Sequence, residues 1–363
     1  AHEAFESWRA VPAPKRGDIV LRAWRIMEER KEAIAEKLSR EEGKIYPEAL
    51  GEVQKTLNCL EYLGGEGRRM SGVSRESELS RNYAFTRKVP LGAVGLITPW
   101  NFPVAIPAWK IAPALVTGNT IVLKPSELTP ATACEVVQCF IDAGVPAGVL
   151  NLVHGMGEDV GAAIVEAPEI RAISFTGSNE VGQHIYAQGA ARGIRVQCEM
   201  GGKNPIIVLE DADIALAAAA TAAGAFGSTG QRCTATSRAI VHESIADEYV
   251  ALVKAAAEKV VAGDPLKEGI TMGPSVDAEQ FERVCGYLQV GQSEAELIVG
   301  GHPMTEEGLD KGFFIAPTIF DHVSPDARIA TEEIFGPVLS VIRVKNFEEA
   351  IEVANGVRYG LSS

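Results

Sequence analysis

The sequence is poor in cysteine and aromatic residues and has no concentrated positive charge. Its six cysteines show neither CxxC pairs nor the close spacing of a small secreted disulfide scaffold, so we expect reduced thiols in a cytoplasmic protein. Acidic residues outnumber basic ones by 48 to 34, and no block of lysine or arginine occurs. This balance argues against nucleic acid or an anionic membrane surface as a partner. No group of histidine, cysteine and carboxylate residues has ligand spacing, so no metal is expected.

The sequence also lacks a signal peptide and any apolar run long enough to span a bilayer. It begins at AHEAFESW, without an initiator methionine and inside a helical pattern, and it stops at YGLSS. We therefore expect a fragment or a processed segment of a longer protein. At 46% hydrophobic and 23% charged residues, the 363-residue chain has room for one or two α/β domains.

The hydrophobic periodicity changes along the chain. The first 65 or so residues carry apolar residues at helical spacing. From residue 90 onward, short apolar runs alternate with amphipathic segments, which predicts a parallel sheet with helices on its faces. The runs are AVGLI (93–97), TIVLK (120–124), VLNLV (149–153), AISF (172–175), IRVQC (194–198) and PIIVL (205–209).

A second series of the same kind follows and predicts a second α/β domain. Helices are expected near 212–226, 244–262 and 277–291, and strands near 238–242 and 338–344. One long polar, arginine-rich stretch at 68–92 interrupts the first series. It is expected to be a linker or an arm that reaches a neighbouring subunit.

Glycine, proline and polar residues follow four of the predicted strands, where ligands gather in a parallel sheet. The four segments are TPWNFP (98–103), KPSELTP (124–130), TGSNEVG (176–182) and EMGGKNP (199–205). TGSNEVG opens a helix and suits a phosphate, but it lacks the full GxGxxG pattern. Lys124 and Glu127 could hold ribose hydroxyls, or they could belong to a solvated turn that caps the helix starting at Thr129.

These four segments, followed by GQRCTA (230–235) and EEIFGPV (332–338), resemble in that order the signature series of the NAD(P)-dependent aldehyde dehydrogenase superfamily. The resemblance runs over essentially the whole chain. Compared with a complete subunit of that family, the chain is expected to lack an N-terminal stretch and the C-terminal part of the catalytic domain. It implies an α/β fold with a Rossmann-type NAD(P)-binding domain (1–72 and 91–200), a β oligomerisation arm (73–90) and an α/β catalytic domain (201–363). It also implies a homodimer or a homotetramer.

The resemblance and the chemistry of the residues assign three catalytic roles. An aldehyde has no alkoxide to expel hydride, so Cys233 first attacks the carbonyl and forms a thiohemiacetal, which becomes a thioester on oxidation. Glu199 is the candidate base that activates water against the thioester. The side-chain amide of Asn101 and the backbone N–H of Cys233 are expected to stabilise the oxyanion. Read without the resemblance, Cys233 could be structural, Glu199 a capping or salt-bridged residue, and Asn101 a turn residue.

For the cofactor, the resemblance assigns Lys124 and Glu127 to the adenosine ribose and Ser178, next to Gly177, to the pyrophosphate. Glu333 is assigned to the nicotinamide ribose and Phe335 to the nicotinamide face. Thr98 and Trp100 are expected near the adenosine end. A carboxylate at Glu127 repels a 2′-phosphate, so NAD is favoured, with NADP left open.

The substrate is the least determined part. The resemblance assigns Phe102, Ile106, Trp109, Arg232 and Thr234 to the substrate tunnel. Arg232 either reads an anionic substrate tail or points away into a structural ion pair. The stretch FGSTGQRCTATSR is similar to that of 2-oxoglutarate semialdehyde (2,5-dioxovalerate) dehydrogenases.

Other readings remain open. The GQRCTA core also occurs in non-phosphorylating glyceraldehyde-3-phosphate dehydrogenases and aminoadipate semialdehyde dehydrogenases, and a broad-specificity aldehyde dehydrogenase is a further alternative. A cysteine acyl hydrolase or transferase normally needs a histidine base, and the six histidines fall in no motif. A catalytically inactive structural homologue is the other remote alternative.

Overall fold

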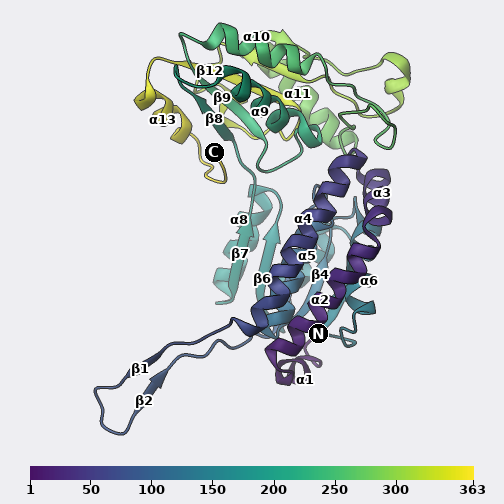
Figure 1. Ribbon diagram of the computed structural model, residues 1–363, viewed down its shortest axis with the longest axis vertical. Helices are drawn as coiled ribbons and strands as arrows, with labels where there is room; N and C mark the ends of the chain where they lie inside the picture. Colours follow the sequence, from purple (N-terminus) through teal and green to yellow (C-terminus); the bar gives the residue numbers. More distant parts are fainter. The chain divides into compact units, whose positions relative to one another are not determined.

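A computed structural model describes residues 1–363 and divides the chain into two compact units (Figure 1). The first comprises Ala1–Glu41 and Ala49–Glu199, and the second comprises Glu42–Glu48 and Met200–Ser363. The short segment 42–48 therefore differs from the expectation that residues 1–72 lie together in one domain. It contacts the second unit because the backbone N–H of Tyr46 donates to the carbonyl of Pro265 at 2.9 Å.

The first unit contains a parallel five-stranded sheet with the order β5-β4-β3-β6-β7. Its strands are β3 (Ala93–Ile97), β4 (Thr120–Lys124), β5 (Leu150–Leu152), β6 (Ile170–Thr176) and β7 (Arg195–Glu199). These confirm the strands predicted from the apolar runs. In chain order the arrangement is 3-2-1-4-5, so the connections change direction between β3 and β6. Ligands of doubly wound sheets bind at the carboxyl ends of the strands at such a point.

Eight helices belong wholly or mainly to this unit. They are α1 (Phe5–Ala10), α2 (Ala13–Glu29), α3 (Lys31–Glu42), α4 (Tyr46–Gly65), α5 (Ala105–Thr117), α6 (Pro130–Asp142), α7 (Ala162–Glu166) and α8 (Asn179–Ala191). The first four confirm the helical prediction for the N-terminal 65 residues. Helix α5 contacts β3 and β4, and α8 contacts β6 and β7. Helix α5 ends where Gly118 adopts a φ of 94°, a left-handed conformation that glycine accommodates without a steric penalty.

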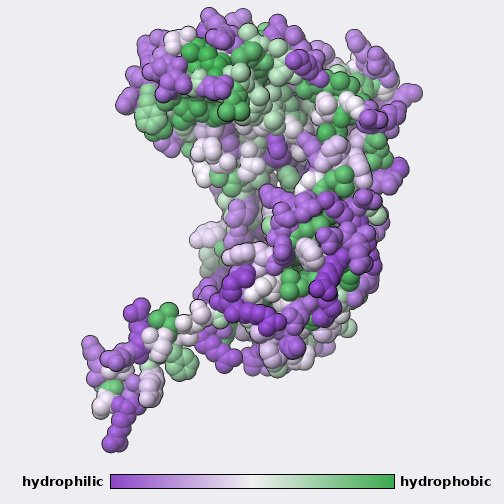
Figure 2. Space-filling view, in the orientation of Figure 1, coloured by the Kyte–Doolittle hydropathy of each residue, from purple (hydrophilic) through white to green (hydrophobic).

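The polar stretch predicted as an interruption forms an antiparallel ribbon of two short strands, β1 (Ser74–Glu76) and β2 (Tyr83–Phe85). The ribbon extends away from the sheet of its own unit (Figure 1). Tyr83 is 92% exposed and Phe85 72% exposed. Figure 2 shows apolar side chains on this ribbon among hydrophilic ones. A two-stranded ribbon with uncovered apolar side chains has little stability of its own in water.

The second unit contains a five-stranded sheet with the order β10-β11-β12-β9-β8, in which only the β10–β11 pair is antiparallel. Its strands are β8 (Asn204–Val208), β9 (Thr236–His242), β10 (Glu296–Val299), β11 (Thr318–Asp321) and β12 (Val338–Val344). Its helices are α9 (Ile214–Phe226), α10 (Ala246–Ala257), α11 (Ala278–Glu294), α12 (Arg328–Thr331) and α13 (Phe347–Asn355). The elements predicted near 205–209, 212–226, 238–242, 244–262, 277–291 and 338–344 are confirmed. Strands β10 and β11 and helices α12 and α13 were not foreseen.

This second sheet is buried on both faces. Ala239 and Val241 of β9 pack into one apolar cluster with α9 and α10, whereas Ile240 packs into another with α11 and α12. Successive side chains of a strand point to opposite faces, so one continuous apolar run supplies both clusters. None of the helices in the structure is long and apolar enough to cross a membrane.

Candidate active site

A cavity of about 660 Å³ lies in the first unit at the carboxyl ends of β3, β4 and β6. Six of the residues predicted to bind the cofactor line it: Thr98, Trp100, Lys124, Glu127, Gly177 and Ser178. The sequence did not single out Gly157, Glu158, Glu180 and His184, which also line it. The cavity lies at the topological switch point between β3 and β6, the position where this kind of sheet binds nucleotides.

Lys124 and Glu127 form an ion pair at one side of this cavity. The buried Nζ of Lys124 lies 2.8 Å from Oε2 of Glu127 and donates to the carbonyl of Pro125 at 2.9 Å. Partial burial alone would raise the pKa of Glu127, but hydrogen bonds from Lys124 and from its own backbone outweigh burial and hold that pKa below its usual value. Glu127 is therefore charged at neutral pH, with its carboxylate at the edge of the cavity.

The turn that contains Glu127 does not cap the following helix with that carboxylate. Helix α6 begins after Thr129, whose side chain makes no capping hydrogen bond. The two oxygens of Glu41 accept the backbone N–H groups of Ala131 and Thr132, each at 2.7 Å. Because Glu41 caps α6, the carboxylate of Glu127 pairs with Lys124 at the edge of the cavity and not with the helix terminus.

Gly177 and Ser178 bring the N-terminus of α8 to the same cavity. The hydroxyl of Ser178 accepts the backbone N–H of Val181 at 3.3 Å, as an N-cap residue does. A methyl group on Gly177 would lie 2.5 Å from the ring of Phe175, so a side chain at this position would require that ring to shift. The N-terminus of a helix favours an anion through its N–H groups and its dipole.

The cavity fits a dinucleotide. Besides an ammonium, a carboxylate and a helix N-terminus, it contains two hydroxyl groups without a partner within the chain. The Oγ1 atoms of Thr98 and Thr176 are buried and lack a hydrogen bond, and both residues line the cavity. Buried polar atoms of native proteins nearly always have a partner, so a polar ligand in this cavity would satisfy them.

Asn101 follows β3 on a loop that is tied to helix α4. Asn101 is only 4% exposed. Three residues later, the carboxylate of Glu52 on α4 accepts the backbone N–H groups of Val104 at 2.9 Å and Ala105 at 3.0 Å, and thereby caps α5. Glu52, which was not predicted from the sequence, is buried and holds the end of the Asn101 loop. Ile106 and Trp109 lie about one turn apart on α5. The backbone N–H of Ile106 donates a hydrogen bond to the carbonyl of Phe102.

Glu199 ends β7 and is connected to a buried lysine that sequence reasoning missed. Nε2 of Gln197 donates to Oε1 of Glu199 at 2.6 Å, and Ser174 donates to Oε1 of the same glutamine. Nζ of Lys110, on α5, donates to Ser174 at 2.6 Å. Burial lowers the pKa of Lys110 to about 8, although the charge of Glu199 acts in the opposite direction. The sequence feature that could have indicated this buried lysine is its position within the apolar run of α5.

Cys233 belongs to the second unit and lies on a tightly bonded turn between α9 and β9. Its thiol is partly exposed, and its carbonyl accepts Nδ2 of Asn204 at 2.7 Å. A methyl group on Gly202 would lie 2.8 Å from that carbonyl. All six cysteines are free. Burial raises the pKa of Cys139 to about 11, as expected of an inert core thiol.

The turn before Cys233 is held from several sides. Ser228, Thr229 and Gly230 have φ values of 51°, 57° and 67°. The side chain of Gln231 accepts the backbone N–H of Val276 at 3.0 Å. A methyl group on Gly230 would lie 2.1 Å from the carbonyl oxygen of Gly336. The backbone leading to Cys233 is therefore in direct contact with the loop that follows Glu333.

Arg232 points its guanidinium toward the end of helix α9. Its Nη2 donates to the carbonyls of Ala223 at 2.9 Å and Gly224 at 3.0 Å. A cation at a helix C-terminus satisfies the last carbonyl groups and the helix dipole. Arg232 thus makes a structural contact, but with helix carbonyls and not as the expected ion pair. A role in reading substrate charge stays a prediction. Thr234 is exposed next to it.

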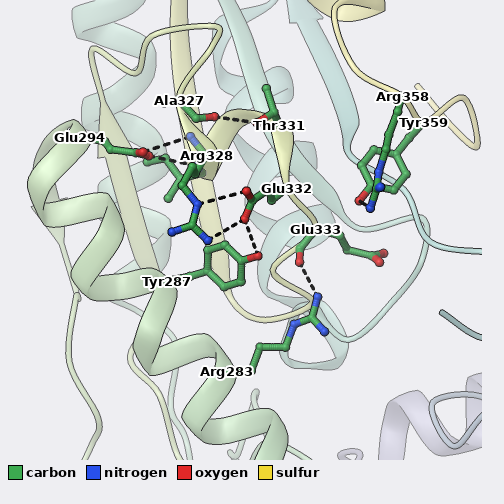
Figure 3. A network of polar contacts seen from close by, with 11 residues as sticks. Arg283, Tyr287, Glu294, Ala327, Arg328, Thr331, Glu332, Glu333, Arg358 and Tyr359 are labelled. Carbon is green, nitrogen blue, oxygen red and sulfur yellow. Dashed lines mark hydrogen bonds and ion pairs between the residues drawn. The ribbon is translucent and has the colours of Figure 1, made fainter. Parts of the chain in front are cut away.

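Glu333 and Phe335 also lie in the second unit, and Figure 3 shows the polar contacts around Glu333. The backbone N–H of Gly202 donates to Oε1 of Glu333 at 2.9 Å. Nη2 of Arg283 donates to the backbone carbonyl of Glu333, also at 2.9 Å. A methyl group on Gly201 would lie 2.0 Å from Oε2 of Glu333, so a larger residue at this position would displace that carboxylate. Phe335 has a φ of 60° and its carbonyl accepts Nε2 of Gln280 at 2.8 Å.

The structure thus groups six predicted cofactor residues in one cavity of the first unit, and Asn101 and Glu199 belong to that unit. Cys233, Arg232, Thr234, Glu333 and Phe335 belong to the second unit. Gly230, Arg232, Glu333 and Phe335 line one small pocket there.

Comparison with known proteins shows the family to which the chain belongs. Residues 1–363 match the model of the aldehyde dehydrogenase family. Alpha-ketoglutaric semialdehyde dehydrogenase of Bacillus subtilis (strain 168) is 46% identical over 364 residues, which cover 100% of this chain and 75% of that protein. 2,5-Dioxopentanoate dehydrogenase of Saccharolobus solfataricus is 44% identical over 359 residues, covering 98% and 74%.

The fold is shared with solved structures. The crystal structure of betaine aldehyde dehydrogenase from Staphylococcus aureus in complex with NAD⁺ superposes with a TM-score of 0.97 at 34% identity, covering 99% of this chain and 72% of that one. These likenesses define an oxidoreductase that uses a nicotinamide cofactor. The chain belongs to the aldehyde dehydrogenase family, whose members oxidise aldehydes with NAD(P). The resemblance and the fold class predicted from the six motifs are confirmed.

Proposed function

We propose that the protein oxidises a carboxylate-bearing semialdehyde, 2,5-dioxovalerate, to the dicarboxylic acid. The observation that carries this proposal is the similarity over 98 to 100% of the chain to two enzymes named for that substrate. The net reaction consumes the aldehyde, NAD(P)⁺ and water, and yields the acid, NAD(P)H and a proton.

The proposed chemistry starts at Cys233. Its thiolate adds to the aldehyde carbon, and the oxyanion receives hydrogen bonds from the amide of Asn101 and the backbone N–H of Cys233. When bound, NAD(P) supplies the acceptor for the hydride that leaves this adduct. A thioester on Cys233 remains, and Glu199 takes a proton from the water that cleaves it. The thiolate is thereby regenerated and the acid is released.

We propose that the first unit holds the nucleotide in the cavity at the carboxyl ends of β3, β4 and β6. Lys124 and Glu127 hold the adenosine ribose, Gly177 and Ser178 the pyrophosphate, and Thr98 and Trp100 contribute at the adenosine end. Glu333 and Phe335 act on the nicotinamide side. The geometry that supports this assignment is the ion pair beside the N-terminus of α8.

The charge of Glu127 gives a prediction on cofactor choice. Glu127→Ala is expected to lower the preference for NAD, the kcat/KM with NAD divided by that with NADP, by roughly 10-fold. The reason is that the carboxylate that repels a 2′-phosphate is removed. The ratio is measured with one aldehyde at saturating concentration. Glu158→Ala, at another carboxylate of the cavity, serves as the matched variant. An unchanged ratio in Glu127→Ala would detach Glu127 from the ribose.

We further propose a homodimer or a homotetramer in the cytoplasm. The uncovered apolar side chains of the β1–β2 ribbon support association through this segment, and the six free cysteines are in keeping with a reducing compartment. Size-exclusion chromatography with light scattering determines the oligomeric state.

The substrate proposal is tested with a panel of aldehydes. The panel contains 2,5-dioxovalerate, succinate semialdehyde, glyceraldehyde 3-phosphate, betaine aldehyde and a neutral aliphatic aldehyde, each with NAD and with NADP. We expect the highest kcat/KM for 2,5-dioxovalerate. A preference for the neutral aldehyde would leave the family assignment intact and remove the proposed carboxylate recognition.

Arg232 is tested in the same panel. If its guanidinium only closes the end of α9, Arg232→Gln lowers stability and changes all substrates alike. If it reads the substrate, the variant raises KM selectively for the carboxylate-bearing aldehydes. The selectivity ratio between 2,5-dioxovalerate and the neutral aldehyde separates these two roles.

A further inference from the structure

The first turn of α4 places a partly buried carboxylate, that of Glu48, against the turn that precedes Cys233. Oε1 of Glu48 accepts the backbone N–H of Ser228 at 2.7 Å. Both residues belong to the second unit, although they are 180 positions apart in the chain. A hydrogen bond from a backbone N–H to an ionised acceptor is about twice as strong as one between neutral groups.

The turn that Glu48 contacts is strained. Ser228 and Thr229, two residues with side chains, follow each other in the left-handed region, and Gly230 continues it. Each left-handed residue with a side chain carries a steric cost, so the conformation persists only where the surroundings hold it. The N–H of Ser228 is the first polar group of this turn, and its acceptor is Glu48.

The charges around Glu48 connect it to Arg232. Burial raises the pKa of Glu48, and the N–H of Ser228 and the positive charges of Lys44 and Arg232 oppose that effect. A methyl group on Gly227 would lie 3.0 Å from Nη2 of Arg232 and 3.4 Å from Oε1 of Glu48, so both charged groups flank the start of the turn. Arg232 is bound in turn to the end of α9.

We infer that Glu48 is a positioning residue for the reaction: its carboxylate holds the left-handed turn 228–230, and through it the thiol and the backbone N–H of Cys233. This inference rests on the proposed role of Cys233 as the nucleophile. Glu48 acts through the turn and does not touch the substrate.

The test uses Glu48→Ala and Glu48→Gln in the full chain. The first removes the acceptor, whereas the amide oxygen of the second can still accept the N–H of Ser228. We expect Glu48→Ala to slow NADH formation in the first turnover and kcat by roughly 10- to 100-fold, the scale set by small misplacements of a reacting group. KM for NAD is expected to change less than about twofold, because the residues proposed to hold the adenosine ribose and the pyrophosphate belong to the first unit. Glu48→Gln is expected to stay within about fivefold of wild type.

A matched control is Glu349→Ala in the same unit. Glu349 also accepts one backbone N–H, that of Lys345 at 2.8 Å, but on α13. It is expected to leave the first-turnover rate unchanged. Circular dichroism and the melting temperature of each variant establish that folded proteins are compared.

A second variant tests the strain directly. Glycine adopts left-handed angles without steric cost, so Ser228→Gly in the background of Glu48→Ala is expected to recover roughly three- to tenfold of the lost rate. The melting temperature of the double variant shows whether the recovered rate reflects the turn or a general gain in stability. Wild-type first-turnover kinetics in Glu48→Ala, or Glu48→Gln as slow as Glu48→Ala, would overturn the inference. An active Cys233→Ala would instead remove the proposed function on which it rests.

Discussion

Cys233→Ala is expected to abolish NAD(P)H formation from every aldehyde, together with any esterase activity. Without the thiol no thiohemiacetal forms, and the hydrated aldehyde alone gives no comparable adduct. The loss in kcat is expected to be at least about 10³-fold, as for other removed nucleophiles. NAD binding, measured by fluorescence titration, is expected to remain, because Cys233 does not line the cavity of the first unit.

The matched control for this variant is Cys285→Ala, a partly buried free cysteine on α11 in the same unit. It is expected to keep wild-type turnover. Alkylation followed by peptide mass spectrometry identifies the thiol that NAD and aldehyde protect. Turnover that survives in Cys233→Ala would remove this residue from the nucleophile's role and reopen the five other cysteines.

Glu199→Gln is expected to form one equivalent of NADH rapidly and then to stall. Thiohemiacetal formation and hydride loss do not need the carboxylate, whereas cleavage of the thioester does. Steady turnover is expected to fall by roughly 10²- to 10³-fold, the usual contribution of a general base. Because a glutamine oxygen can still accept the N–H of Gln197, the variant removes the base with little change in geometry.

Rapid-mixing fluorescence separates the burst from the steady rate. Addition of hydroxylamine, a nucleophile that needs no base, is expected to restore turnover in Glu199→Gln. Glu210→Gln, at an exposed carboxylate of the second unit, serves as the control. Unchanged steady turnover in Glu199→Gln would mean that another group activates the water.

The strands were predictable where a run of apolar residues is buried on both sides. AVGLI forms β3 with every residue buried, and the run itself is the signal. Strand β10 escaped prediction because it is a short edge strand, with Glu296 and Leu297 exposed. Segment 42–48 reads as part of the N-terminal helical series, and only the tertiary contacts of Tyr46 and Glu48 assign it to the second unit.

Candidate site residues could be proposed from the sequence where their neighbours along the chain mark them. Cys233 stands out through its small and hydroxylated neighbours, and Gly177 through the helix that it precedes. The direction of the Arg232 side chain could not be predicted, because it depends on where the carbonyls of α9 end in space. Glu48 and Glu52 look like the polar face of an amphipathic helix. Their backbone partners, Ser228 and Val104, are 180 and 52 positions away.

The close approach of Gly230 to Gly336 also sets terms for protein engineering. A methyl group on Gly230 would overlap the carbonyl oxygen of Gly336, and one on Gly336 would overlap the side chain of Val284, so a larger residue at either position would force its neighbours to shift. Loop insertions or backbone remodelling beside Cys233 are therefore a poor route to a new substrate range. Changes to exposed side chains that leave the backbone alone, Thr234 first among them, offer the safer starting library.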